Sequence, residues 1–402
     1  MPALSAAATR LLARLDSLAA VFAPHFAAAE QLARLPAAIC GPLRQEGFFR
    51  LWIPRANDGL ELPLPDALRI YEAAAAMDGS LGWAVMIGAG GGLFAAWLPP
   101  PGAQELFGPP EALVAGSGSP CGVAERVPGG YRVQGRWRFA SGAHDASVFT
   151  AACVVTAAGA PVRTAAGVPL VRAMSIAPAE VRILDSWDPV GMRGTGSHDF
   201  EVHGAFVPEH HSFSVLTDAA RERGPLYQLP FSVLTELPVS AVGLGITRHA
   251  LSEFAQSLPA HSAAGASSAA LSTRFAQARA ALEQAAAVTG SLAQEAWQTV
   301  AQGARLDAEQ LARITVSCCV SQERLRQAVG DLASVAGMRA IDRRSGFSRA
   351  WRDLQTLGAH GSIAPQRLIA AGAVLLDQAG RNDTISSASV ASGAPQTLPV
   401  HT

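Results

Sequence analysis

The chain has 402 residues and a formal net charge of −1; 49% of its residues are hydrophobic and only 16% are charged. This length leaves room for two or three domains with a large core, and the composition excludes wholesale disorder. All 31 basic residues are arginines, so lysine chemistry such as a Schiff base or a P-loop is excluded, and the near-zero charge argues against binding to nucleic acid.

The first region, residues 1–111, is expected to be a helical domain. Apolar residues recur at helix spacing over residues 11–22, and two further helical patterns run through Leu43 and Leu68. The uncharged run from Leu81 to Leu98 is long enough to raise the question of a membrane span. Its internal glycines and the prolines that follow Leu98 favour a buried helix and turn instead.

The second region, residues 112–212, shows the alternation that is typical of strands. Between residues 131 and 139, aromatic and aliphatic side chains alternate with arginines and a glutamine, after a Pro-Gly-Gly turn. Residues 149–155, 168–176 and 200–206 indicate further strands. Several short strands separated by turns predict a small β-barrel or sandwich.

The third region, residues 213–382, returns to long alanine-rich patterns with an apolar stripe and is expected to form a helical bundle. Residues 383–402 are rich in Ser, Ala, Pro and Thr and are expected to be a flexible tail. The order of helices, strands and helices predicts an α+β fold. The sequence contains neither G-x-G-x-x-G nor G-x-S-x-G.

The cysteines and histidines give no strong metal signal. The five cysteines are odd in number and lack C-x-x-C spacing, so they fit neither a disulfide framework nor a zinc site and favour the cytoplasm. His198, His203, His210 and His211 lie close in sequence without the spacing of known zinc motifs. We interpret them as surface residues and predict no metal, with a metal site as the weaker alternative.

Two short segments in the strand region are candidates for ligand binding. The run from Gly116 to Pro120, with Ser117 and Ser119, is small enough for backbone N–H groups to approach an anion or a planar ring, although a flexible turn has the same composition. If strand alternation persists, Trp137, Phe139 and Ser141 share one face. Two aromatic rings and a hydroxyl suit a planar ligand, although core packing has the same pattern.

Two later segments carry polar residues among apolar ones. The loop from Asp185 to Ser197 interleaves Trp187 with polar residues and glycines, which favours function over packing. Near the C-terminus, Arg352 and Asp353 are adjacent, so they cannot face each other on a helix and each needs another partner. His360 follows them in an otherwise apolar region.

These segments, in this order, resemble the acyl-CoA dehydrogenase superfamily over nearly the whole chain. Residues 130–142 resemble its flavin-contacting strand, and residues 191–197 resemble the segment that closes its β domain. The resemblance implies an N-terminal helical domain, a middle β-barrel and a C-terminal four-helix bundle. It also implies a homotetramer.

The superfamily has two main chemistries, and the residues after Asp353 bear on the choice. Many dehydrogenases take an α-proton with a glutamate about eight residues after such an Arg-Asp pair, but residues 354–366 contain no carboxylate. A dehydrogenase with its base elsewhere, such as Glu236 or Glu253, and a non-catalytic flavin-fold scaffold remain alternatives. His360 matches the flavin-dependent monooxygenase branch.

That branch implies a site and its partners. A separate flavin reductase would supply reduced FMN or FAD, and the protein would use O2 to hydroxylate a small aromatic or polycyclic substrate. Ser141 would lie near flavin N5 and stabilise the oxygen adduct, Trp187 would pack beside the ring, and His360 would be the acid–base residue. Arg274 resembles an arginine that holds the flavin, often across a subunit boundary.

Overall fold

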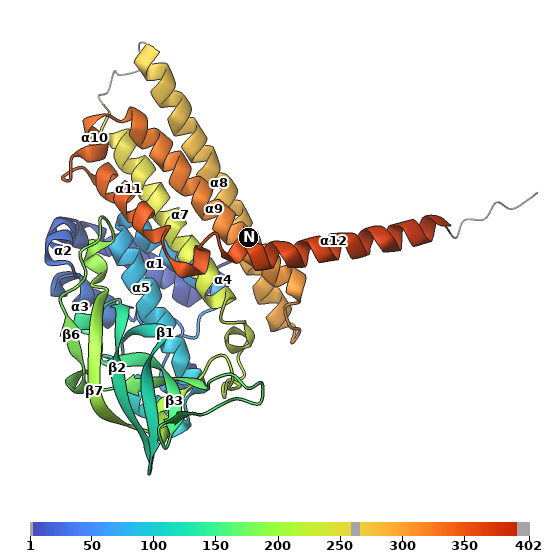
Figure 1. Cartoon of the computed structure of the whole chain (residues 1–402). Coiled ribbons are helices and arrows are strands. Elements are labelled where there is room, and N and C mark those ends of the chain that lie inside the picture. Colours follow the sequence, from blue (N-terminus) through green and yellow to red (C-terminus); the bar gives the residue numbers. More distant parts are fainter. Residues whose placement is uncertain (1–2, 259–265, 392–402) are drawn as a thin grey trace, which may run out of the picture.

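The computed structural model describes residues 3–258 and 266–391. Helices occupy one end of the molecule and a sheet occupies the other, and the last helix projects sideways (Figure 1). The α+β architecture expected from the sequence is therefore confirmed.

The N-terminal part is built from helices that bury one face. Ser5 caps α1 by accepting a hydrogen bond from the Ala8 N–H, and α1 buries Leu11, Leu15 and Phe22 at helix spacing. The helices are α1 (Ala6–Phe22), α2 (Phe26–Leu32), α3 (Ala37–Gln45), α4 (Leu64–Met77), α5 (Gly79–Gly92) and α6 (Pro100–Phe107).

Two of these stretches, Ala6–Leu32 and Gly79–Trp97, are long and apolar enough to cross a membrane by length and composition alone. In the most apolar part of the second stretch, 78% of the residues are buried inside the protein, which is typical of a core helix. This burial agrees with the interpretation of the Leu81–Leu98 run as a buried helix and turn.

The middle part is one eight-stranded sheet in the order β6-β7-β2-β1-β3-β5-β8, with β4 paired to β3. Only the β1–β3 pair is parallel. The strands are β1 (Val114–Val127), β2 (Gly130–Ala140), β3 (Val148–Ala157), β4 (Ala160–Pro161), β5 (Val171–Ile176), β6 (Arg182–Leu184), β7 (His198–Pro208) and β8 (Ser212–Phe213).

This sheet corrects the expected barrel. The two end strands, β6 and β8, are short and do not pair with each other within the described residues, so the sheet is open. The strand expected around residues 131–139 is present as β2, but its alternation stops early. A register shift against β7 falls between Trp137 and Ala140, and Phe139 adopts a positive φ of 67°.

That bulge separates residues expected to share a face. Trp137 is completely buried and stacks on Phe200, with ring centroids 5.1 Å apart, whereas Phe139 is 55% exposed. The Trp137 Nε1–H donates to the Ala152 carbonyl oxygen at 2.8 Å. Trp137 is therefore a core residue of the sheet.

The C-terminal part consists of α7 (Val233–Gln256), α8 (Ala266–Ala301), α9 (Ala308–Val335), α10 (Met338–Ile341), α11 (Gly346–Leu357) and α12 (Arg367–Ala391). Helices α7, α8 and α9 run side by side, and α12 starts beside α9 and then extends away from the molecule (Figure 1). Helix α12 thus continues beyond residue 382, where a flexible tail was expected to begin, and residues 392–402 lie outside the described range.

Candidate active site

A cavity of about 300 Å³ lies where the N-terminal helices, the sheet and α7 meet. Phe94 forms part of its wall, and its ring contacts those of Phe213 and Phe231 at centroid distances of 4.9 and 6.4 Å. Its lining is Trp52, Trp83, Met86, Ile87, Gly90, Gly91, Leu93, Phe94, Val114, Gly116, Ser117, Gly118, Thr150, Ala152, Val171, Ala173, Phe213, Ser214, Val215, Leu216, Phe231, Leu234, Thr235, Val239 and His360.

Among the described residues, His360 is the one titratable side chain in this lining, and no carboxylate belongs to it. The residue caps η9 (Gly361–Ile363), with its Nδ1 accepting the Ser362 N–H at 3.3 Å. Its ring lies edge-on to Trp83 at 5.1 Å, and burial lowers the pKa of the imidazole. The imidazole is therefore neutral at pH 7, and since Nδ1 accepts, the ring proton is on Nε2.

A chain of hydrogen bonds starts at Trp83. Its Nε1–H donates to Ser141 Oγ at 2.9 Å; Ser141 Oγ lies 2.8 Å from Ser197 Oγ, and Ser197 Oγ lies 2.7 Å from Thr195 Oγ1. The Thr195 hydroxyl donates to the Met192 carbonyl oxygen at 2.8 Å.

The end of this chain fixes its direction, because each hydroxyl has a single proton. Thr195 gives its proton to Met192, so it accepts from Ser197, and Ser197 in turn accepts from Ser141. The Ser141 proton is therefore committed, and its oxygen has one lone pair left to accept a further hydrogen bond.

A smaller cavity of about 30 Å³ adjoins the main one, and the two share Ile87 and Val114. Ser141 and Thr195 line the smaller cavity together with His144. The His144 ring lies edge-on to His198 at 5.0 Å, and burial lowers its pKa. The hydroxyl chain thus forms a polar wall beside an apolar cavity.

Behind the Asp185–Ser197 loop lies a buried group of charges. Asp353 of α11 accepts the Met192 N–H, and Asp78 lies 3.3 Å from Arg349 in an ion pair. Burial, followed by the charge of Asp78, raises the pKa of Asp353 to about 7. Arg352 pairs with Glu30, so the two adjacent residues have separate partners, as expected.

The loop fits closely against α11 at this point. A Cβ atom placed on Gly191 would lie 2.2 Å from the Arg352 carbonyl oxygen, so only glycine permits this approach. The Asp353 hydrogen bond then fixes Met192, whose carbonyl oxygen also accepts the Trp187 Nε1–H at 3.2 Å. Helix α11 therefore positions the loop that carries Trp187 and Thr195.

The sequence-predicted residues divide into those at the cavities and those elsewhere. Ser117 and His360 line the main cavity and Ser141 the smaller one, whereas Ser119 is exposed and lines neither. Gly116, Ser117 and Ser119 lie within β1, where the register shifts between Ser117 and Gly122, and not in a turn.

The aromatic and arginine candidates lie outside the cavity linings. Phe139 and Trp187 contact each other edge-on at 6.1 Å, and the Arg138 guanidinium lies over the Phe139 ring. Arg274, on α8, pairs with Asp331 at 3.1 Å, so its expected contact with flavin stays a prediction.

The alternative bases Glu236 and Glu253 lie outside the main cavity lining. Glu236 is 1% exposed, accepts a hydrogen bond from Thr315 and pairs with Arg367. A Cβ on Gly346 of α11 would meet Glu253, which therefore points toward α11.

The sequence analysis missed Trp83, which joins His360 to Ser141. Its position in the apolar Leu81–Leu98 run gave no signal beyond an aromatic ring among glycines. The interpretation of the histidines as surface residues was also wrong for His198 and His211, which are 2% and 9% exposed. His198 is buried because its Nδ1 accepts the N–H groups of Ser186 and Trp187.

Known proteins resemble this chain across most of its length. The family described as acyl-CoA dehydrogenase, C-terminal domain, matches residues 237–365. The indole-3-acetate monooxygenase of Pseudomonas putida is 30% identical over 343 residues, which cover 82% of this chain and 84% of that protein. The oxygenase component of the FADH2-dependent resorcinol hydroxylase of a Rhizobium species is 27% identical over 392 residues, which cover 90% and 92%.

A solved structure agrees with these relatives. The HsaA monooxygenase from M. tuberculosis has a TM-score of 0.82 at 26% identity, with 90% of this chain and 97% of that chain covered. The long match to a 30% identical relative and the shared fold together identify the family. This chain belongs to the flavin-dependent monooxygenases of the acyl-CoA dehydrogenase superfamily, and it is an oxidoreductase of the two-component type with a flavin as its cofactor.

Proposed function

We propose that this oxygenase hydroxylates a small aromatic substrate in the main cavity. The observation that carries the proposal is the lining itself, which is largely apolar and aromatic and, over the part of the chain that the structure describes, has His360 as its one titratable group. Two relatives are named for aromatic compounds, indole-3-acetate and resorcinol.

Residues from both cavities and from the Asp185–Ser197 loop fit a flavin. Gly116 of the main cavity lining packs against β3, where a Cβ would lie 2.1 Å from the Thr150 carbonyl oxygen, so only glycine fits there. Ser117, Ser141 and Trp187 would hold the ring, and Arg274 would hold it from a second subunit. The bound reduced flavin supplies the electrons that activate O2. Ser141, whose oxygen accepts, matches a ligand that presents an N–H group, as a reduced flavin does.

His360 is the proposed acid–base residue. Burial lowers its pKa, so the ring is neutral near neutral pH and its Nε2–H can donate a hydrogen bond. The ring can therefore donate to oxygen or orient a phenol-like hydroxyl. Exclusion of water by the aromatic wall protects the reaction from unproductive release of hydrogen peroxide.

The test is substrate-dependent O2 consumption with a separate flavin reductase, across a panel of small aromatic compounds. His360→Ala is expected to lower product formation by about a hundredfold, with electrons diverted to hydrogen peroxide while flavin still binds. His203→Ala, which changes an exposed histidine of β7, is the control and should retain full activity. Unchanged coupling in His360→Ala would make the histidine structural.

Dehydrogenase chemistry is tested in the same preparation. The wild type should not bleach oxidised flavin anaerobically when acyl-CoA compounds are added, because the described residues of the cavity lining offer no carboxylate base. Bleaching would overturn the proposal in favour of a dehydrogenase. Failure to bind flavin in either redox state would favour the scaffold alternative.

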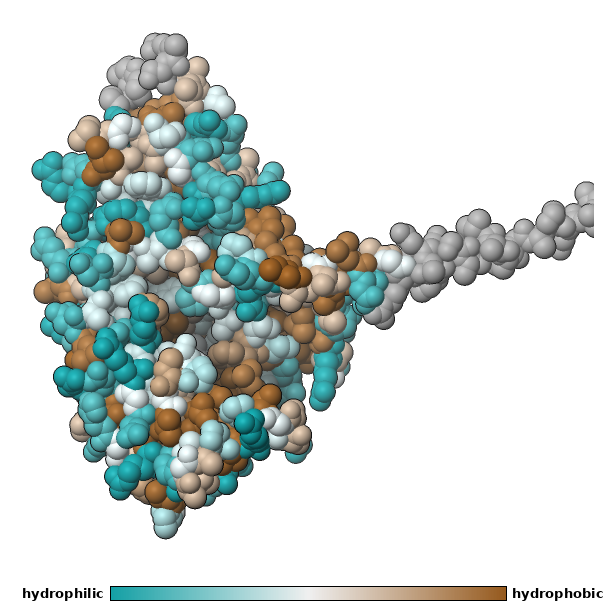
Figure 2. Space-filling view, in the orientation of Figure 1, coloured by the Kyte–Doolittle hydropathy of each residue, from teal (hydrophilic) through white to brown (hydrophobic). Residues whose placement is uncertain are grey.

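We also propose a homotetramer in the cytoplasm that is supplied by a flavin reductase, with docking or diffusion alone as the route of transfer. Hydrophobic surface gathers at the base of the projecting α12 (Figure 2), and Ile369 and Leu376 on this helix are 77% and 75% exposed. The five cysteines are free thiols, in keeping with a reducing compartment.

The assembly has a direct test. Light scattering should give a tetramer, and Ile369→Glu with Leu376→Glu should shift it to smaller species. A wild-type monomer at micromolar concentration would contradict the assembly.

A further inference from the structure

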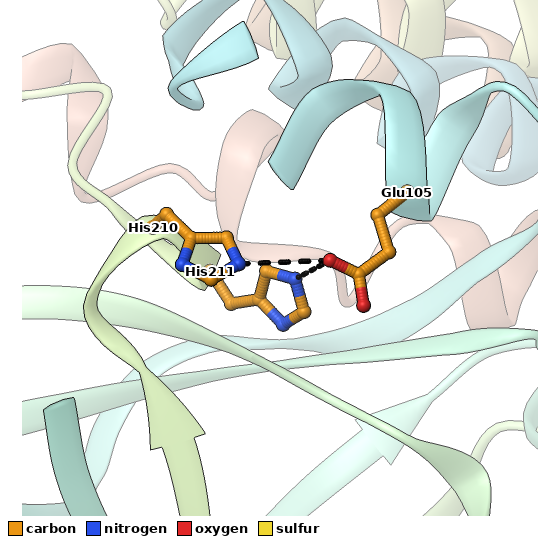
Figure 3. A group of neighbouring side chains, drawn as sticks. All are labelled: Glu105, His210 and His211. Carbon is orange, nitrogen blue, oxygen red and sulfur yellow. Dashed lines mark hydrogen bonds and ion pairs between the residues drawn. The ribbon is translucent and has the colours of Figure 1, made fainter. Parts of the chain in front are cut away.

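Three metal-ligating side chains meet outside both cavities. Glu105 comes from α6, and His210 and His211 are adjacent residues of η7 (Glu209–His211). Figure 3 shows both imidazole rings reaching toward the same carboxylate oxygen. The short 3₁₀ turn places two neighbouring side chains on one side, whereas a strand would point them to opposite faces.

The distances among these atoms match a metal coordination site. His211 Nε2 lies 3.0 Å and His210 Nε2 lies 3.6 Å from Glu105 Oε2, and all three ligand atoms lie within 4.8 Å of one another. A tetrahedral ion with bonds of about 2.0–2.1 Å separates its ligand atoms by about 3.4 Å. Small side-chain rotations would therefore bring all three atoms to one ion.

The backbone holds the two elements in place. The Glu209 N–H donates to the Gly129 carbonyl oxygen at 3.1 Å, and the Ser212 hydroxyl donates to the Glu209 carbonyl oxygen at 2.9 Å. A Cβ on Gly102 of α6 would lie 2.3 Å from the His210 carbonyl oxygen. The helix and the turn are thus in close backbone contact before any ion binds.

Exposure is graded across the group. The His211 side chain is 11% exposed, that of His210 42% and that of Glu105 60%. One ligand is therefore anchored inside the protein, and the other two face solvent, where an ion and a water molecule would enter. Two imidazoles and one carboxylate favour a borderline transition metal over Mg²⁺ or Ca²⁺, which prefer oxygen ligands.

We propose that Glu105, His210 and His211 bind one Zn²⁺ ion with water as the fourth ligand. The ion joins α6 to the turn that leads directly into β8 and residues 213–216, which line the main cavity. None of the three ligands lines the cavity itself, so the ion acts indirectly, by holding this wall of the cavity in place.

The test uses full-length protein without a histidine tag, stripped with a chelator and then titrated with Zn²⁺ or Co²⁺. The expected result is about one equivalent per chain, a visible Co²⁺ spectrum of low coordination number, and a melting temperature that rises with Zn²⁺. His211→Gln and Glu105→Gln should each weaken binding by more than about a hundredfold, since even changes around a ligand cost about 10–100-fold.

His203→Gln is the matched control. His203 lies 3.3 Å from Glu201, but it is 73% exposed, and the described residues place no second histidine beside that carboxylate, so its loss should leave the stoichiometry unchanged. Equal binding in wild type, His211→Gln and Glu105→Gln would overturn the proposal, as would no binding by the wild type. Circular dichroism of the metal-free variants separates a lost ligand from a lost fold.

Discussion

Two buried polar networks meet at Met192, and they differ in charge. The Met192 carbonyl oxygen accepts from the neutral hydroxyl chain, and its N–H donates to the charged group. The neutral network comprises Trp83, Ser141, Ser197 and Thr195; the charged one comprises Asp78, Asp353 and Arg349.

Because of this difference, the two networks respond differently to pH. Hydroxyl and indole groups keep their protons over the working range, so the wall beside the cavity does not change with pH. Asp78 and Asp353 titrate, because burial disfavours the charged forms of both and the charge of Asp78 further raises the pKa of Asp353. Of these two networks, the one behind the loop is therefore sensitive to pH and the one beside the site is not.

Asp353→Asn should have the largest effect, and it should act on the pH dependence of the free energy of unfolding. The native pKa of Asp353 is about 7 and the unfolded value about 3.9, so the native state binds more protons between these values and stability falls as pH rises from 4 to 7. The difference corresponds to about 4 kcal/mol at most. Asn keeps an acceptor for the Met192 N–H, so the variant should flatten this slope in urea unfolding.

The control for that slope is Asp342→Asn. Asp342 pairs with Arg344 on the surface, which lowers the pKa of the carboxyl, so its titration lies below the window. This variant should keep the wild-type slope between pH 4 and 7. An unchanged slope in Asp353→Asn would mean that the buried pair does not titrate in the native state.

Ser141→Ala tests the neutral network and should have a smaller effect. It removes the acceptor of the Trp83 Nε1–H and the donor to Ser197, and leaving buried groups without partners costs about 1–3 kcal/mol. The free energy of unfolding should drop equally at pH 5 and pH 8. Ser119→Ala, at an exposed serine, should change it by less than about 0.5 kcal/mol. A loss of stability that depended on pH would contradict this expectation and would show that the two networks are coupled.

Arg274→Ala should have the smallest effect on stability. Its ion pair with Asp331 joins side chains that are 43% and 58% exposed, and such pairs contribute about 0–1 kcal/mol. If Arg274 holds flavin from a neighbouring subunit, flavin affinity should fall while stability does not. Arg279→Ala, on the same helix and paired with Glu283, is the control. Equal flavin affinity in both variants would remove Arg274 from the site.

Local patterns predicted the parts of the fold that depend on local sequence. The alternation over residues 131–139 found β2, and long apolar stripes found α8 and α9. The bulge at Phe139 was not predictable in this way, because it is set by pairing with β7, about sixty residues later in the chain. Strand β1 was missed because Gly116 to Pro120 contains no alternation.

The site shows the same limit. Ser141, Trp187 and His360 were singled out because polar or aromatic residues stood in unusual surroundings, but the connection of His360 to Ser141 through Trp83 depends on residues far apart in the chain. Trp137 was assigned to the ligand because an aromatic ring in an alternating strand suits a core and a site equally well. Its contact with Phe200 decides for the core.

Because the hydroxyl chain has a fixed direction, a substitution at its far end could reverse the direction in which the Ser141 hydroxyl donates its proton. Thr195→Val would remove the group that takes the Ser197 proton, and Ser197 could then turn and donate to Ser141. Ser141 would in turn direct its own proton outward and present a donor where it now presents an acceptor. A substitution two residues from Ser197 would thereby reverse the polarity at the site and favour an oxidised flavin over a reduced one, which a lower reduction potential of the bound flavin would reveal.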